Sequence, residues 1–202
     1  MNIWKNYALR LSAVGAYRSF LVLPPVQALA KLIRALAEET ADDEALLDHY
    51  AETFYALQKA GYDSLGGYLW EHFRYDETPY GDAAARGTAN AALVDAARWD
   101  VETFAALSAV TPAQWRAAVA RRAGEEAAAL LPVWRADDTL SFEVLTEEYR
   151  KNGAGEFARY KAFTWSNHTL LRVVDPDLEE HALIGYEEER KEVQDNTRAL
   201  LA

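Results

Sequence analysis

Residues 89–115 read ANAALVDAARWDVETFAALSAVTPAQW, and this stretch predicts the class of fold. Its apolar side chains recur with the period of an α-helix, at Leu93, Ala97, Val101, Phe104 and Leu107. A second helix start follows directly, because Thr111 is a good N-cap and Pro112 suits the first helical position. Gln114 can return a hydrogen bond to the cap and so complete a capping box. We therefore expect a long helix over about residues 89–110 and another that begins at residue 112.

The same helical period continues toward the N-terminus. Pro24-Pro25 and Gly61 interrupt the apolar stripes, because proline suits a first helical turn and glycine suits the residue after a last one. Acidic side chains at Asp42 and Asp43 favour the positive end of a helix dipole. These signals predict helices over about residues 4–14, 25–36, 42–60 and 64–75.

On the C-terminal side, the helix that begins at residue 112 is expected to run to Leu131, with Gly124 as its weak point. A further helix is expected over Ser141–Lys151. The segment Asp76–Thr88 holds a proline and two glycines among polar residues, which is typical of a loop. We expect it to be the main loop of the chain.

The period changes from helical to alternating near the C-terminus. Phe157–Trp165 alternates and is rich in aromatic residues, a turn sequence follows at 166–168, and Thr169–Val174 is apolar and β-branched. The fold class is therefore predicted to be mainly α, a multi-helix bundle with a small β-hairpin near the C-terminus. We expect a helical N-terminal domain over residues 1–155, followed by the hairpin and a connecting segment over residues 156–202.

Composition narrows the possible functions. The 202 residues carry a formal net charge of −11, which argues against general affinity for nucleic acid or for an anionic membrane. Cysteine is absent, so a reducing cytoplasm is the expected location. No apolar run is long enough to span a bilayer. Residues 1–37 carry five basic side chains and no acid, whereas residues 38–82 carry twelve acids. We expect these two segments to pack together, and the alternative is a basic docking arm for an acidic partner.

The end of the chain, Val173–Ala202, reads VVDPDLEEHALIGYEEERKEVQDNTRALLA. It holds a proline-containing linker, a short apolar run closed by glycine, and a charged helix. This order resembles the entry to the nucleotide-binding module of AAA+ ATPases, and is most similar to an uncharacterised bacterial group of ATP-binding proteins. The resemblance implies that the backbone of the apolar-apolar-glycine step faces adenine, which gives a candidate site of Leu183, Ile184, Gly185 and Tyr186.

The phosphate-binding pattern G-x-x-x-x-G-K-[ST] does not occur in these 202 residues. We therefore expect no ATP hydrolysis by this fragment itself, and we interpret it as the front end of a longer ATPase. The resemblance implies that the full-length protein binds ATP and Mg²⁺ and can form oligomers. The helical domain would then recruit a protein partner or substrate for a AAA+ module that follows in cis. The alternative hypothesis is a free-standing all-α interaction module without nucleotide chemistry.

Other candidate sites are weaker. His72 and Asp76 lie four residues apart on a predicted helix, with His49 as a possible third metal ligand, but ordinary histidines near carboxylates are the favoured interpretation. Carboxylates in the 72–82 segment suggest a hydrolase as a third hypothesis. Phe163 and Trp165 share one face of their predicted strand, where we expect packing rather than base stacking. We assign no catalytic residue and no metal ligand.

Overall fold

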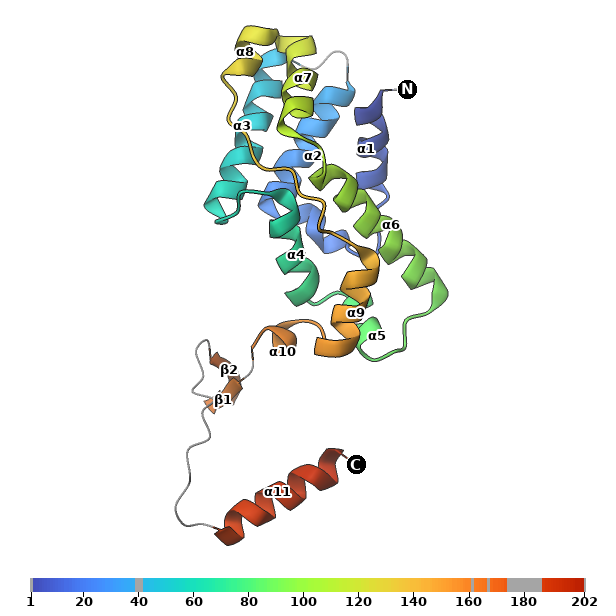
Figure 1. Cartoon of the computed structure of the whole chain (residues 1–202), viewed down its shortest axis with the longest axis vertical. Helices are drawn as coiled ribbons and strands as arrows, with labels where there is room; N and C mark the ends of the chain where they lie inside the picture. The colour runs from blue at the N-terminus through green and yellow to red at the C-terminus, as the bar shows by residue number, and fades with distance from the viewer. Residues whose placement is uncertain (1, 39–41, 161, 167, 174–186, 202) are drawn as a thin grey trace. The chain divides into compact units, whose positions relative to one another are not determined.

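The computed structural model describes residues 2–38, 42–160, 162–166, 168–173 and 187–201. The chain separates into two compact units, residues 1–161 and residues 162–202 (Figure 1). The first unit contains the helices α1 (Ile3–Ser12), the 3₁₀ helix η1 (Arg18–Val22), α2 (Pro24–Ala37), α3 (Asp43–Lys59), α4 (Leu65–Tyr75), α5 (Pro79–Ala85), α6 (Ala91–Ser108), α7 (Pro112–Ala123), α8 (Glu125–Ala129), α9 (Phe142–Asn152) and α10 (Glu156–Arg159).

The second unit contains strands β1 (Ala162–Ser166) and β2 (Thr169–Val173) and helix α11 (Glu187–Leu201). The strands pair in antiparallel register, with Phe163 opposite Arg172 and Trp165 opposite Leu170. The fold class is thus mainly α with a small β-hairpin near the C-terminus, as the sequence predicts. Among the described residues, no helix is both long and apolar enough to cross a bilayer.

Most helices of the first unit begin at a side chain that caps them. In each case a side-chain oxygen accepts a hydrogen bond from a backbone N–H in the first turn. The capping residues are Asn2, Asp42, Ser64, Thr78, Asn90, Thr111 and Ser141. At Thr111 the Gln114 side chain returns the bond, so the predicted capping box is confirmed. Local sequence therefore sets where these helices start.

The prediction that Asp76–Thr88 is a loop was wrong, because α5 occupies its centre. Thr78 caps this helix by accepting from the Gly81 N–H at 3.1 Å, and Pro79 takes the first helical position. Tyr80 and Ala84 are buried one turn apart, which stabilises a helix too short to persist alone. Tertiary packing outweighs the loop-forming composition here.

Two predicted element boundaries also need correction. Gly124 has φ +88°, a conformation that L side chains rarely adopt, and it divides the helix expected to reach Leu131 into α7 and α8. The strand expected to begin at Phe157 begins at Ala162, because the residues before it form α10. The N–H groups of Ala158 and Arg159 donate to the carbonyl of Gly155, which starts that helical turn.

An aromatic core holds α9 against the rest of the first unit. The rings of Tyr17, Phe20 and Phe73 lie 4.6–5.3 Å apart between centroids. The buried hydroxyl of Tyr149 on α9 donates to the carbonyl of Phe73 on α4. Its oxygen can therefore accept from the Tyr17 hydroxyl, which lies 3.2 Å away. Packing and hydrogen bonding together fix the buried face of α9.

The extended segment between α8 and α9 fixes the position of α9 in the first unit (Figure 1). The Arg135 N–H donates to the carbonyl of Asp63 at 2.7 Å, and the Asp137 N–H donates to the carbonyl of Ser108 at 2.9 Å. These bonds join the segment to the residues before α4 and to the end of α6. The segment therefore positions α9 beside α5 and α6.

The Asp137 carboxylate is expected to make stability depend on acid pH. Burial raises its pKa, but hydrogen bonds from Thr139 and Ser64 and the charge of Arg135 more than offset this, so the net shift is below the ordinary 3.8. A lowered pKa in the folded state stabilises the protein above pH ~4, and this stabilisation is lost as pH falls through the folded pKa. Urea unfolding between about pH 3 and 6 should therefore show a shallower acid loss for Asp137→Asn than for the wild type. Equal slopes would contradict this assignment.

The basic and acidic segments pack side by side where α2 meets α3. Lys31 Nζ lies 3.2 Å from Glu52 Oε2, and both side chains are about two-fifths exposed. An ion pair of this exposure contributes little to stability. It does show that the positive α2 and the negative α3 face each other, as expected from the charge pattern.

Candidate functional site

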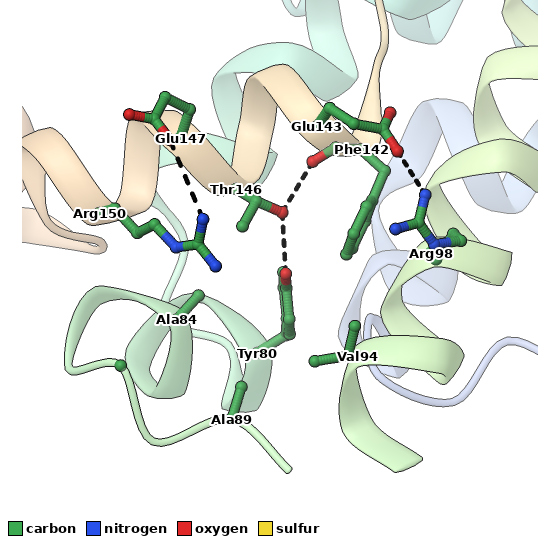
Figure 2. A pocket seen from close by; sticks show the side chains of 11 residues that line it. Tyr80, Ala84, Ala89, Val94, Arg98, Phe142, Glu143, Thr146, Glu147 and Arg150 are labelled. Carbon is green, nitrogen blue, oxygen red and sulfur yellow. Dashed lines mark hydrogen bonds and ion pairs between the residues drawn. The ribbon is translucent and has the colours of Figure 1, made fainter. Parts of the chain in front are cut away.

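A pocket of the helical unit lies where α5, α6 and α9 meet (Figure 2). Its volume is about 410 Å³. Ligand pockets in proteins begin at about 300 Å³, so this one has room for a small molecule or for side chains of a partner. The lining residues are Tyr80, Ala84, Gly87, Ala89, Val94, Arg98, Phe142, Glu143, Thr146, Glu147 and Arg150.

One face of α9 forms a wall of this pocket. Phe142, Thr146 and Arg150 follow one another at intervals of four residues, so they share a face of the helix. The Thr146 hydroxyl donates to the Phe142 carbonyl at 2.8 Å. Because that uses its single hydrogen, the Tyr80 hydroxyl donates to Thr146 Oγ1, also at 2.8 Å. Figure 2 shows the chain of bonds from Tyr80 through Thr146 to Phe142. These hydrogen bonds join α5 to α9.

The apolar part of the pocket is made by rings and small side chains. The rings of Tyr80 and Phe142 lie 5.4 Å apart between centroids, and Val94 of α6 lies across from them. Ala84 and Ala89 add small apolar side chains to the lining (Figure 2). An apolar group that enters this space would lose contact with water on several sides at once.

Charged side chains surround the opening. Arg98 forms an ion pair with Glu143, and its guanidinium carbon lies 4.3 Å from the Phe142 ring centroid. The hydrogen bond from Arg98 lowers the pKa of Glu143, which is therefore ionised at neutral pH. Across the opening, Arg150 lies 4.0 Å from Glu147. The opening thus carries two positive and two negative groups, paired with each other.

This arrangement favours binding over catalysis. The hydroxyls of Tyr80 and Thr146 are engaged with each other and with the backbone. The pairs at the opening are largely exposed, and such pairs are weak enough to exchange partners. A ligand with an apolar centre and charged flanks would match both the walls and the opening.

The residues assigned to adenine, Leu183, Ile184, Gly185 and Tyr186, lie outside the described residues. The structure does bring His72 and Asp76 together, with Nδ1 and Oδ2 2.7 Å apart. His49 does not join them, since its nearest acidic neighbour is Glu52 at 3.9 Å. Over the described part of the chain, no group of three His, Asp or Glu side chains is arranged to hold a metal.

The remaining candidates from the sequence are the carboxylates of the 72–82 segment and the aromatic pair Phe163 and Trp165. The 72–82 segment contributes Tyr80, rather than a carboxylate, to the pocket. Phe163 and Trp165 lie on β1, where Trp165 is 67% exposed and Phe163 is half-buried. Trp165 is therefore a large aromatic side chain exposed on the hairpin.

Sequence reasoning did not find this pocket. The one signal in the sequence was Thr146, which stands between Phe142 and Arg150 at helical spacing. A threonine on a buried helix face needs a hydrogen-bond partner, so Thr146 indicated a contact with another element. The partner, Tyr80, lies 66 residues earlier in the chain. Nothing in the local pattern connects the two positions.

Fold and site together define a mainly α protein with a pocket between the helices of its first unit. No family model matches the chain, and no curated protein or solved structure matches it either.

Proposed function

We propose that the helical unit is a recruiting domain that binds a protein partner through the pocket between α5, α6 and α9. The main support for this proposal is the combination of an apolar pocket of about 410 Å³ with ion pairs at its opening. A partner segment with one or two apolar side chains between charged residues fits this combination. The apolar groups supply affinity, and the charges orient the segment.

The resemblance of Val173–Ala202 to the start of a AAA+ module supports the further proposal that this recruiting role belongs to an ATP-binding protein. In that proposal the full-length protein binds ATP and Mg²⁺ and assembles as an oligomer, and the helical unit delivers a substrate or partner to the ATPase module. The coding sequence after residue 202 tests this part. An apolar strand followed by G-x-x-x-x-G-K-[ST] supports it, and a stop codon favours the free-standing interaction module.

Val94→Asp is expected to weaken partner binding by about tenfold or more, because a carboxylate in the apolar part of the pocket must lose its water when the pocket is filled. The measurement is affinity capture from lysate of the source cells with quantitative mass spectrometry, followed by calorimetry with the purified partner. Val144→Asp is the matched control, since Val144 lies on α9, is 51% exposed and is outside the lining. Equal loss of the same partner in both variants, with equal thermal stability, would contradict the proposal.

A further inference from the structure

A second pocket lies between the start of α1 and the ends of α2 and α7 (Figure 1). Its volume is about 340 Å³, which is enough for a small ligand. We call it the α1–α7 pocket and define it by residues 2–4, Leu36, Ala118, Arg121 and Arg122. It shares no residue with the pocket of Figure 2.

The charge of this lining is opposite to that of the whole chain. The lining holds two arginines and no acidic residue, whereas the chain has a formal net charge of −11. Arg122 is partly engaged, because its Nη1 donates to the carbonyl of Glu38 at 2.7 Å and its Nη2 lies 3.7 Å from Asp43 Oδ1. Arg121 is exposed and makes no hydrogen bond or ion pair to any described residue. Arg121 is therefore the positive charge available to a ligand.

The other polar side chains of the lining belong to Asn2 and Trp4. The Asn2 Oδ1 accepts from the backbone N–H of Trp4 at 3.0 Å, and its Nδ2 donates to the carbonyl of Leu36 at 3.2 Å. The Trp4 Nε1–H, in contrast, is buried and has no acceptor in the part of the chain that the structure describes. Guanidinium and indole N–H groups can only donate. The two side chains of the lining with unpartnered polar groups, Trp4 and Arg121, therefore favour a ligand that brings acceptor oxygens and negative charge.

The apolar wall of the pocket is packed before any ligand enters. Trp4 is 5% exposed and stacks on Trp115, with 4.7 Å between the ring centroids. Leu36 and Ala118 are also buried. Ile3, however, is 55% exposed, so its side chain loses contact with water when a ligand covers it. A matching ligand therefore has an apolar part beside its negative group.

Electrostatics limits the number of negative groups on that ligand. Asp43 is largely exposed beside Arg122, and together with the net charge of the chain it repels ligands that carry several carboxylates or phosphates. Nucleic acid, an anionic membrane and a strongly acidic protein segment therefore fit less well. A carboxylate has a single negative charge and can pair with a guanidinium through two parallel hydrogen bonds. One carboxylate on an apolar chain matches the lining best.

We propose that the α1–α7 pocket binds a small aliphatic carboxylate, that is, a single carboxylate on a short alkyl chain. The Arg121 guanidinium pairs with the carboxylate, and the alkyl chain lies against Trp4, Leu36 and Ile3. This inference does not depend on the function proposed for the pocket of Figure 2, since the two sites use different helices.

The test is isothermal titration calorimetry of the whole 202-residue chain with sodium octanoate. Three compounds separate the contributions of charge and chain: acetate lacks the alkyl chain, 1-octanol lacks the charge, and octylammonium reverses it. We expect saturable binding of octanoate, and at least about tenfold weaker binding of the other three. A hexapeptide of alternating Glu and Leu is titrated in parallel. Tighter binding of this peptide than of octanoate would identify an acidic protein segment as the occupant and overturn the proposal.

Arg121→Gln should weaken octanoate binding about tenfold, because it removes the charged partner of the carboxylate. Arg121→Lys should fall between Arg121→Gln and the wild type, since it keeps the charge and loses the paired hydrogen bonds. Ile3→Ser should weaken binding about fivefold through the lost apolar contact. Thermal unfolding of each variant shows whether it is folded, because a positive charge in the last turn of α7 also favours the helix dipole.

Arg86→Gln is the matched control, because it changes the net charge equally and Arg86 is exposed outside this lining. It should bind octanoate as the wild type does. Val94→Asp should also bind normally, which separates this inference from the proposed function. Absence of saturable octanoate binding up to about 10 mM would overturn the inference. So would equal affinity for octanoate and 1-octanol, or equal affinity of the Arg121→Gln and Arg86→Gln variants.

Discussion

Asp100→Ala is expected to lower the free energy of unfolding by about 3 kcal/mol. Asp100 lies on α6 and is 1% exposed. Its Oδ2 accepts the N–H groups of Gly15 at 3.1 Å and of Tyr17 at 3.0 Å. Alanine would leave the buried Tyr17 N–H without a partner and would remove the bond to the exposed Gly15, in the turn that leads from α1 into η1. Urea unfolding followed by circular dichroism measures the loss.

Asp100→Asn separates hydrogen bonding from charge. Burial raises the pKa of Asp100, and the N–H bonds from Tyr17 and Gly15 oppose that rise without cancelling it. The negative charge is therefore costly at this position, and the two short bonds converge on a single oxygen. Asparagine can place its carbonyl oxygen there and should lose about 1 kcal/mol or less. A loss for asparagine as large as for alanine would show that charge, rather than the acceptor, holds the turn.

Gly66→Ala is expected to destabilise the first unit by about 3 kcal/mol. A Cβ at residue 66 would lie 2.7 Å from Asp137 Cβ and 2.8 Å from its Cγ. Asp137 has little freedom to move, because its carboxylate accepts from Ser64 and Thr139 and its N–H donates to Ser108. The clash would therefore push α4 away from the extended segment that precedes α9. Thermal and urea unfolding of purified protein measure the effect.

Gly15→Ala is the control for this experiment. A Cβ there meets nothing closer than Ala13 O at 3.9 Å, and the N–H that Asp100 accepts is kept. We expect a change within about 0.5 kcal/mol. If Gly66→Ala were as mild as Gly15→Ala, the contact between α4 and the extended segment would be looser than the structure has it.

The adenine-facing role of Leu183, Ile184, Gly185 and Tyr186 stays a prediction from resemblance. The pocket, in contrast, was found only through the fold. Arg98 meets Glu143 across 45 residues of sequence. Each side chain is ordinary in its own helix. Its role in the site depends on a contact with a residue far away in the sequence, which the local pattern does not predict.

The sequence by itself determined the helical class, the starts of the helices capped by Asp42, Ser64, Thr111 and Ser141, and the stop at Gly61, where φ is +83°. These features depend on contacts within one or two turns, so the local order of residues is sufficient to specify them. Only the tertiary structure decided that α5 is a helix, that Asp100 holds a turn 83–85 residues away, and that α5, α6 and α9 enclose a pocket. The physical reason is that burial and hydrogen-bond satisfaction over long sequence separations are collective, and they can override local propensity.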